Sequence, residues 1–346
     1  MIDTTIESVV SMPILNPETG ARSRTFEYWG VVDKLEGSTI IDWKSTDDPA
    51  RFIHQKRIGL QAELYALALK AAGVHVDTIE YRLIQKPGLK FSPATYKWAV
   101  MKAGRKSAVK VCETEDEAKK LAVMQGGTVE KRVKGDDGRD KYEERCLSWV
   151  LEDPTRMVTH SHHLTSARLD QAKHLLWEST KRILDNRRTG RWLANEHACF
   201  NYNRECECLP LCECEMMGGD TDWIIEDQYE VVDDLHPELG GVERSKDVLT
   251  YSSCSKLRLC EVKYYWQVER GLRRRGRDTG DALWIGSAMH AGLEAYAKGG
   301  VSEALPAIDQ WAESSPIIGE VQARFQDQQI GKARAMVRAA AIKWGS

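Results

Sequence analysis

Two short segments near the start of the chain carry two carboxylates and one ammonium group that could meet in space. The segment GVVD ends at Asp33, and after a gap of hairpin size the segment IIDWK carries Asp42 and Lys44. On a strand, Asp42 and Lys44 share a face, and Asp33 would meet them from the neighbouring strand. Carboxylates suit Mg²⁺ or Mn²⁺, and a lysine can orient a water for attack on phosphorus. A surface salt bridge is the competing interpretation, because a lone D-x-K pattern often occurs by chance.

The elements that must position these groups are a hairpin, a helix and a further strand. Residues 28–32 and 39–43 are rich in β-branched and aromatic residues around a tight polar corner, which predicts two paired strands. From 58 to 72 apolar residues recur at helical spacing, and Gly73 follows as a stop. Residues 76–85 predict another strand, so the order is that of a mixed α/β core.

Three more polar side chains could belong to the same site. Gln61 and Tyr65 lie four residues apart on the predicted helix and therefore share one face. His290 closes the segment Gly286-Ser-Ala-Met-His290, far along the chain. A lone histidine is more often a core or surface residue than a ligand, so the residues alone leave the role of His290 open.

The cysteines form a second candidate site. Of nine in the chain, five lie in the segment CFNYNRECECLPLCEC, which begins at Cys199, and Cys254 and Cys260 lie in the last third. Without a secretion signal, such a set indicates metal or redox chemistry before disulfides. Four thiolates could hold a [4Fe–4S] cluster or Zn²⁺ equally well. Cys112, Cys146 and Cys254 are interpreted as small buried hydrophobic residues.

Composition and charge favour a globular protein that acts in a reducing cytosol. The 346 residues are 42% hydrophobic and 29% charged, with a net charge of −3 and no apolar run of membrane-spanning length. Residues 215–242 contain many acids and no Lys or Arg, and an arginine cluster follows. Guanidinium groups bind phosphate bidentately, so this cluster could contact nucleic acid; a solvated surface is the alternative. The cluster comprises Arg273, Arg274, Arg275 and Arg277.

The middle of the chain predicts an inserted subdomain and a long helix. Short Lys-rich strands surround a helix at Glu115–Gln125, which Thr114 would cap. Residues 165–186 predict a long amphipathic helix that leads to the cysteines. The histidines before it are interpreted as opening a polar, exposed helix with no carboxylate at matching spacing, so we do not expect a metal site there. These histidines are His160, His162 and His163.

Together these motifs resemble those of RecB-like nucleases of the PD-(D/E)XK superfamily. The similarity rests on the D-x-K segment, the Q-x-x-x-Y helix, the G-x-x-x-H segment, and LTYSSCSKLRLC followed by Tyr264-Tyr265. It implies an α/β fold with a mixed sheet flanked by helices, and DNA as the substrate. The resemblance to viral and CRISPR-adaptation exonucleases implies cutting at DNA ends.

The resemblance also implies a role for each motif residue. Lys44 would position the attacking water, and Gln61 and Tyr65 would steady Lys44 or the DNA. The implied ligands of Mg²⁺ or Mn²⁺ are His290, Asp33, Asp42 and the main-chain carbonyl of Trp43.

In iron–sulfur members of this group, one cysteine precedes the nuclease core and three follow it. The gap between Cys206 and Cys212 matches the family spacing, whereas the gap before Cys206 is wider than in many members. Cys208 therefore remains an alternative ligand, and Zn²⁺ remains the alternative metal. The implied [4Fe–4S] ligands are Cys199, Cys206, Cys212 and Cys260.

The order of the motifs is reversed relative to the family, because the cysteine and histidine segments come last. A circular permutation explains this better than a truncated nuclease followed by the start of a second, since each motif occurs once. The rival function is an inactive DNA-binding module with a structural metal site. The expected parts are a catalytic half (1–94), an inserted α+β subdomain (95–145), a helix with cysteines and acidic tail (146–239), a linker (240–241) and the remaining half (242–346).

Overall fold

The chain forms two compact units in the computed structural model, which describes residues 5–105, 107–136, 138–201, 204–239, 244–275, 281–314 and 320–345. Unit 1 comprises Met1–Lys44, Ala50–Leu83 and Thr159–Thr279. Unit 2 comprises Ser45–Pro49, Ile84–Val158 and Gly280–Ser346. The expected linker Gly240-Gly241 and Arg277 of the arginine cluster lie outside the described residues.

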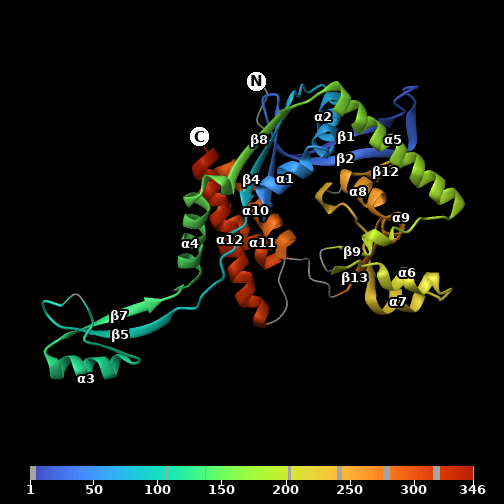
Figure 1. Cartoon of the computed structure of the whole chain (residues 1–346). Coiled ribbons are helices and arrows are strands. Elements are labelled where there is room, and N and C mark those ends of the chain that lie inside the picture. The colour runs from blue at the N-terminus through green and yellow to red at the C-terminus, as the bar shows by residue number, and fades with distance from the viewer. Residues whose placement is uncertain are drawn as a thin grey trace. The chain divides into compact units, whose positions relative to one another are not determined.

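Most strands belong to unit 1 (Figure 1). They are β1 (Thr5–Leu15), β2 (Arg22–Glu36), β3 (Thr39–Thr46), β4 (Thr78–Gln85), β8 (Met157–His163), β9 (Phe200–Asn201), β10 (Arg204–Glu205), β11 (Tyr229–Val231), β12 (Asp247–Leu249) and β13 (Leu272–Arg274). The last two residues of β3 and β4 and the first two of β8 fall in unit 2. The helices are α1 (Pro49–Lys56), α2 (Gln61–Ala71), α5 (Ser166–Thr189), α6 (Leu209–Met216), α7 (Asp222–Gln228), α8 (Tyr251–Leu259) and α9 (Glu261–Tyr264).

The main sheet is mixed. Its strands follow the order β1-β2-β3-β4-β8, and β12 pairs with β2 off this path. The β1–β2 and β2–β3 pairs are antiparallel, whereas β12 runs parallel to β2. Side chains alternate along the first part of β2, where Phe26, Tyr28 and Val32 are buried, and the alternation breaks before Leu35, which is buried in the same cluster. Residues from both halves of the chain therefore build one sheet.

Helices α2, α5 and α8 cover the face of the sheet that carries the core of unit 1. Leu64 of α2, Leu176 of α5 and Cys254 of α8 belong to one buried cluster with Tyr28 and Leu249. Thr250 caps α8 by accepting a hydrogen bond from Ser253 N at 3.2 Å. The segment that begins at β12 thus shares a core with strands more than 200 residues earlier.

Unit 2 is largely helical (Figure 1). Its elements are β5 (Thr95–Met101), β6 (Lys110–Cys112), α3 (Glu115–Gln125), β7 (Thr128–Lys134), α4 (Gly138–Glu152), α10 (Asp281–Gly299), α11 (Val301–Ser314) and α12 (Glu320–Trp344). Gly292 lets α10 approach its neighbours, because a Cβ there would lie 2.7 Å from Ile308 and 3.0 Å from Val337 side-chain atoms. Close packing of three C-terminal helices follows from this small residue.

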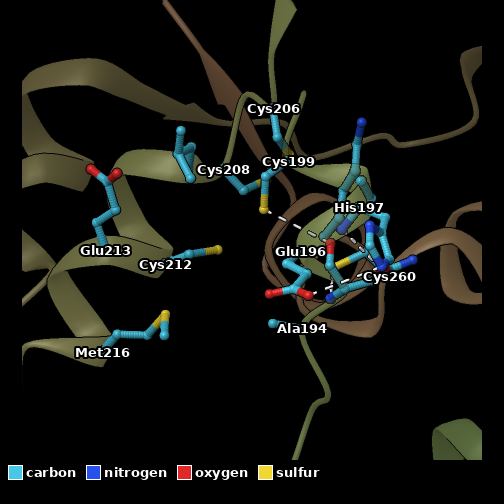
Figure 2. A pocket seen from close by; sticks show the side chains of 14 residues that line it. Ala194, Glu196, His197, Cys199, Cys206, Cys208, Cys212, Glu213, Met216 and Cys260 are labelled. Carbon is cyan, nitrogen blue, oxygen red and sulfur yellow. Dashed lines mark hydrogen bonds and ion pairs between the residues drawn. The ribbon is translucent and has the colours of Figure 1, made fainter. Parts of the chain in front are cut away.

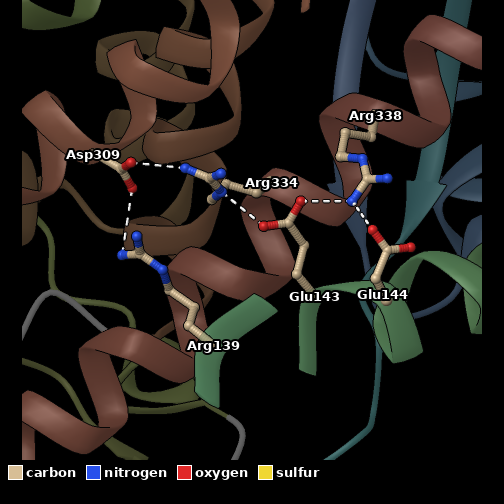
Figure 3. Close-up of polar contacts among 6 residues, drawn as sticks. All are labelled: Arg139, Glu143, Glu144, Asp309, Arg334 and Arg338. Atoms are coloured by element: carbon tan, nitrogen blue, oxygen red, sulfur yellow. Dashed lines mark hydrogen bonds and ion pairs between the residues drawn. The ribbon is translucent and has the colours of Figure 1, made fainter. Parts of the chain in front are cut away.

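Ion pairs join α12 to α4 within unit 2 (Figure 3). Arg334 Nε and Arg338 Nη1 lie 2.7 and 2.8 Å from the two carboxylate oxygens of Glu143, which is 5% exposed at its side chain. Arg334 also pairs with Asp309 of α11 at 2.7 Å. The C-terminal helices are therefore bound to a helix almost 200 residues earlier.

Residues 95–134 form the short strands and the helix that the sequence predicts there. Strands β6-β5-β7 make a separate sheet, and α3 packs on it through Ala118 and Ala122 against Val100 and Cys112. Thr114 Oγ1 accepts a hydrogen bond from Glu117 N at 3.3 Å, as expected of a helix cap.

The expectation of a mixed α/β fold with flanking helices is confirmed, and several details differ. The helix predicted from residue 58 begins at Gln61, and β1 and α1 were not predicted. The interpretation of His160, His162 and His163 as opening a helix is wrong, because all three lie on β8. No helix among the described residues is both long enough and apolar enough to cross a bilayer.

Candidate active site and cysteine pocket

The β2–β3 hairpin sets Asp33 and Asp42 beside each other. The register pairs Lys34 with Ile41, so Asp33 and Asp42 occupy the next positions along the two strands. Asp33 Oδ2 accepts a hydrogen bond from the main-chain N of Trp43 at 2.9 Å. This bond links the two strands at the point where the acidic side chains meet.

Lys44 joins both acids. Its Nζ donates to Asp42 Oδ1 at 2.9 Å and to the main-chain oxygen of Trp43 at 3.1 Å. Asp33 Oδ2 lies 3.7 Å from the same nitrogen. The two-residue spacing of Asp42 and Lys44 puts both on one face of β3, as the alternation of a strand requires. Three oxygen atoms from two strands therefore surround one cation.

The charges in this group compensate each other. Burial alone would lower the pKa of Lys44, but Asp33 and Asp42 together raise it well above its usual value, so the ammonium stays protonated. Asp42 is 3% exposed, and its Oδ2 is buried with no hydrogen-bond partner within the described part of the chain. A buried carboxylate oxygen of this kind is costly unless a cation or donor reaches it.

Helix α2 adds Gln61 and Tyr65 to the site. Gln61 Nε2 donates to the Tyr65 hydroxyl at 2.9 Å. A Cβ at Gly30 would lie 2.7 Å from Tyr65 Cε1, closer than real Cβ contacts come. The glycine of the GVVD segment therefore lets the tyrosine ring pack on β2. Burial, followed by the charge of Asp42, raises the pKa of Tyr65 well above its usual value, so the hydroxyl stays neutral.

A second lysine that the sequence analysis missed lies beside Gln61. Lys56, the last residue of α1, donates from Nζ to Gln61 Oε1 at 3.1 Å. The same nitrogen lies 5.2 Å from the ring centroid of Phe52 and 5.5 Å from that of Tyr81. No motif marks Lys56 in the sequence, and the helix that ends at Lys56 was not predicted.

A buried ion pair fixes the turn between α1 and α2. Glu63, with 0% of its side chain exposed, lies 2.5 Å from Arg168 Nε and 3.3 Å from His162 Nε2. Arg168 also donates to the main-chain oxygens of Arg57 and Gly59 at 2.6 and 2.7 Å. Burial would raise the pKa of Glu63, but hydrogen bonds from His162 and Arg168 lower it. His162 therefore has a carboxylate partner, contrary to the sequence-based expectation.

The oxygen atoms around Lys44 fit a hard divalent cation. Two carboxylates and one main-chain carbonyl are ligands that Mg²⁺ and Mn²⁺ accept, and the partnerless Oδ2 of Asp42 offers a lone pair. Across the described ranges, no three His, Cys, Asp or Glu side chains are arranged around one point as a single-ion site would need. Asp33 and Asp42 would therefore supply only some of the ligands that such an ion needs.

His290 lies on α10 in unit 2, one turn after Gly286. A Cβ at Gly286 would lie 3.6 Å from Ser45 Oγ, and Ser45 directly follows Lys44 in the chain. Both residues belong to unit 2, so the start of α10 lies beside the end of β3. His290 is half-buried and already has an interaction partner.

Five cysteines from three chain segments line one pocket of about 550 Å³ in unit 1 (Figure 2). Asn195 N donates to Cys260 Sγ at 3.4 Å, and Cys206 N donates to the main-chain oxygen of Cys199 at 2.7 Å. Cys212 comes from α6, whose Leu211 is buried in one apolar cluster with Cys208 and Cys260. The cysteines in the pocket are Cys199, Cys206, Cys208, Cys212 and Cys260.

Electrostatic coupling distinguishes the pocket cysteines from the others. Burial raises the pKa of Cys212 to about 12, and the thiols of Cys206, Cys260 and Cys199 add to the shift. These are the other three ligands that the family resemblance implies. Cys214 does not line the pocket, and its Sγ donates to the main-chain oxygen of Asp220 at 3.2 Å.

The remaining cysteines are buried as the sequence analysis expected. Cys112, Cys146 and Cys254 are 2%, 0% and 0% exposed. All are free thiols, and no disulfide involves them.

The arginine cluster lies partly in a strand rather than in a loop. Arg273 and Arg274 end β13, which pairs with β11 of the acidic stretch. Arg274 donates to Gln228 Oε1 at 3.3 Å, and Arg275 donates to the main-chain oxygen of Glu226 at 2.8 Å. The acidic stretch thus engages two of the arginines that were expected to contact phosphate.

Comparisons with known proteins bear on the C-terminal part of the chain. No curated protein matches the chain, and no solved structure matches it. The hairpin with Asp33, Asp42 and Lys44 lies outside the one segment for which a family match is found. That segment, residues 248–346, matches the family model of the PD-(D/E)XK nuclease superfamily.

Proposed function

We propose that this protein is a metal-dependent DNA nuclease whose site is built on the β2–β3 hairpin. The observation that carries the proposal is the convergence of Asp42, Asp33 and the Trp43 carbonyl on Lys44 Nζ. A surface salt bridge does not account for this group. Asp42 is buried, and one of its carboxylate oxygens has no hydrogen-bond partner within the described residues. Carboxylates held beside a lysine suit hydrolysis of phosphodiesters.

Each side chain has a distinct role in this proposal. Asp33, Asp42 and the Trp43 carbonyl would hold Mg²⁺ or Mn²⁺, which lowers the pKa of a bound water and so supplies the nucleophile. Lys44 orients that water through its remaining N–H group and compensates the charge of the acids. Gln61 and Tyr65 hold each other at 2.9 Å and border Lys44 from α2.

The family match supports a nuclease and a permuted order of its parts. The matched segment contains His290 and Cys260 but none of the hairpin residues. Its first strand, β12, joins β2 in the main sheet, and Gly286 lies beside Ser45. We propose that His290 completes the cation site with Asp33 and Asp42, and that the two parts form one nuclease domain.

We further propose that the pocket cysteines hold a [4Fe–4S] cluster and that the enzyme acts at DNA ends. Support for the cluster is that Cys199, Cys206, Cys212 and Cys260 line one pocket, although no three of the described thiols are arranged around a single point. Support for action at ends is the resemblance to exonucleases alone.

The test is cleavage of linear and circular duplex DNA by the purified protein with Mg²⁺, with Mn²⁺ or with EDTA. We expect loss of linear DNA with either metal and none with EDTA. Asp42→Ala and Lys44→Ala should lower the rate at least 100-fold while the melting temperature shows a folded protein, because each removes a group used at the chemical step.

Lys34→Ala is the matched control, since Lys34 lies on the same hairpin and pairs with the half-exposed Glu36 at 3.4 Å. It should cut DNA at the wild-type rate. Equal rates in the wild type and both site variants would overturn the site assignment. Binding without cutting under all conditions would instead favour an inactive DNA-binding module.

A further inference from the structure

Lys56 is a cation beside the candidate active site that the proposed mechanism does not use. Its ammonium is bound by the Gln61 amide oxygen at 3.1 Å and lies against the rings of Phe52 and Tyr81. Gln61 at the same time donates to Tyr65, so one amide links Lys56 to the tyrosine. The contacts hold a flexible side chain at a fixed place next to the Q-x-x-x-Y helix.

The backbone that carries Lys56 is also fixed. Arg168 of α5 binds the main-chain oxygens of Arg57 and Gly59, directly after Lys56, and pairs with buried Glu63 on α2. The short turn between α1 and α2 gains two charge-assisted hydrogen bonds from Arg168, and α2 gains a third through Glu63. Such bonds are roughly twice as strong as neutral ones, so the turn is rigid.

The charge of Lys56 has no carboxylate partner among the described residues, in contrast to Lys44. Burial lowers the pKa of Lys56, while Asp42 opposes the shift and Lys44 adds to it. The charges of Asp42 and Lys44 on the hairpin therefore both act on the ammonium group of Lys56. An anion that arrived there would find one half-buried ammonium already desolvated and aimed by Gln61.

We propose that Lys56 binds a phosphate of the nucleic acid at this site, as a second cationic contact next to Lys44. The inference rests on the proposed nuclease function. Gln61 acts as a positioning residue for Lys56, which gives the glutamine of the Q-x-x-x-Y helix a defined task. Lys56 supplies binding energy to the phosphate diester and takes no part in activating water.

The test separates DNA binding from cleavage. All variants are made in the Lys44→Ala chain, which cannot cut, and the affinity for a short fluorescein-labelled DNA duplex with one single-stranded end is measured by anisotropy over a range of salt. Lys56→Ala and Lys56→Gln should weaken binding about tenfold and reduce the slope of log K against log salt by about 0.9, the value for one phosphate contact. Lys56→Arg should bind almost as well as the parent.

Lys70→Ala is the matched control, because Lys70 is exposed near the other end of α2, and it should leave affinity and slope unchanged. If Lys56→Ala fails to fold, Lys56→Gln decides, since it keeps the length and a donor. Unchanged affinity and salt slope in Lys56→Gln, with cleavage by the wild type intact, would overturn this inference and leave the nuclease proposal standing. A wild-type protein that does not cut DNA, together with a Lys44→Ala chain that does not bind it, would overturn both.

Discussion

Gly30 is the residue that lets the tyrosine of the site approach the sheet. A Cβ at this position would lie 2.7 Å from Tyr65 Cε1 and 3.0 Å from the Tyr28 hydroxyl. Gly30→Ala should therefore displace the Tyr65 ring and destabilise the protein by about 1–3 kcal/mol, the usual effect of overpacking. Calorimetric or denaturant unfolding measures the change.

A second substitution distinguishes this contact from a general effect on β2. In a Tyr65→Ala chain the ring is absent, so Gly30→Ala should cost much less, and the double-mutant cycle should show a coupling of about 1 kcal/mol or more. An identical cost in both backgrounds would mean that the Gly30–Tyr65 approach does not limit the site. Cleavage should fall with Gly30→Ala, because Gln61 loses a correctly placed partner.

The sequence was enough to predict that Asp33, Asp42 and Lys44 lie together, because side chains along a strand alternate between its two faces. It could not find Lys56. The contact between Lys56 and Gln61 depends on the turn that Arg168 holds, and no local pattern encodes a main-chain oxygen bound from another helix. The partner of His162 was missed for the same reason, since Glu63 is distant in the chain and adjacent only in space.

The buried pair of Glu63 and Arg168 joins α2 to α5, and it should make stability depend on pH. The pKa of Glu63 is lowered in the folded protein. Its contribution is therefore complete above the unfolded value of about 4.3 and is lost as the pH falls through the lower folded value. At pH 7 we expect Glu63→Gln to cost about 2 kcal/mol, less than the 3–5 kcal/mol of a fully buried pair, because Arg168 is 22% exposed.

Melting temperatures of the wild type and Glu63→Gln measured from pH 7 to pH 3 test this expectation. The gap between the two proteins should be largest at pH 7 and narrow below about pH 4. A gap that stayed constant across this range would show that the charge of Glu63 contributes nothing. Glu80→Gln is a suitable control, because Glu80 is a partly exposed acid of the neighbouring strand β4.

The cysteine pocket joins α6, the segment around Cys199 and the start of α9. Substitution of its cysteines therefore tests the contacts between these elements. Cys260→Ala should abolish bound iron and lower the melting temperature, because a metal site that links distant segments contributes folding energy. Cys254→Ala on α8, six residues earlier, removes a thiol that is 0% exposed and should keep the metal. Full iron content in purified Cys260→Ala would exclude this residue as a ligand, and bound zinc in place of iron would replace the cluster with a single-ion site.

Elements with strong local signals were predictable and those defined by their partners were not. The caps of α3 and α5 stand at Thr114 and Thr165, where side-chain oxygens accept hydrogen bonds from the first turn. β1 was missed because its residues mix polar and apolar types and include Pro13, so its identity as a strand comes from pairing with β2.

At the scale of the whole molecule, the segment that matches the nuclease family does not coincide with either compact unit. Residues 248–279 fall in unit 1 and residues 280–346 in unit 2. In unit 1, β12 pairs with β2, and Leu249 and Cys254 are buried with Tyr28. In unit 2, Arg334 and Arg338 pair with Glu143 of α4. Each half of the segment therefore depends on residues from the first half of the chain.

These contacts lead to a prediction that separates a permuted domain from two tandem fragments. A chain of residues 242–346 alone loses the partner strand of β12 and leaves the arginines of α12 without Glu143. It should show no cooperative thermal transition, since most of its core surface would be exposed. Mixed or co-expressed with residues 1–241, it should form a complex that melts cooperatively and, if His290 completes the cation site, cuts DNA. Replacing His290 by Ala in the second fragment should leave the complex intact and abolish cutting. A cooperative transition in the isolated fragment would instead identify residues 242–346 as the start of an independent domain, and the tandem arrangement would replace the permuted one.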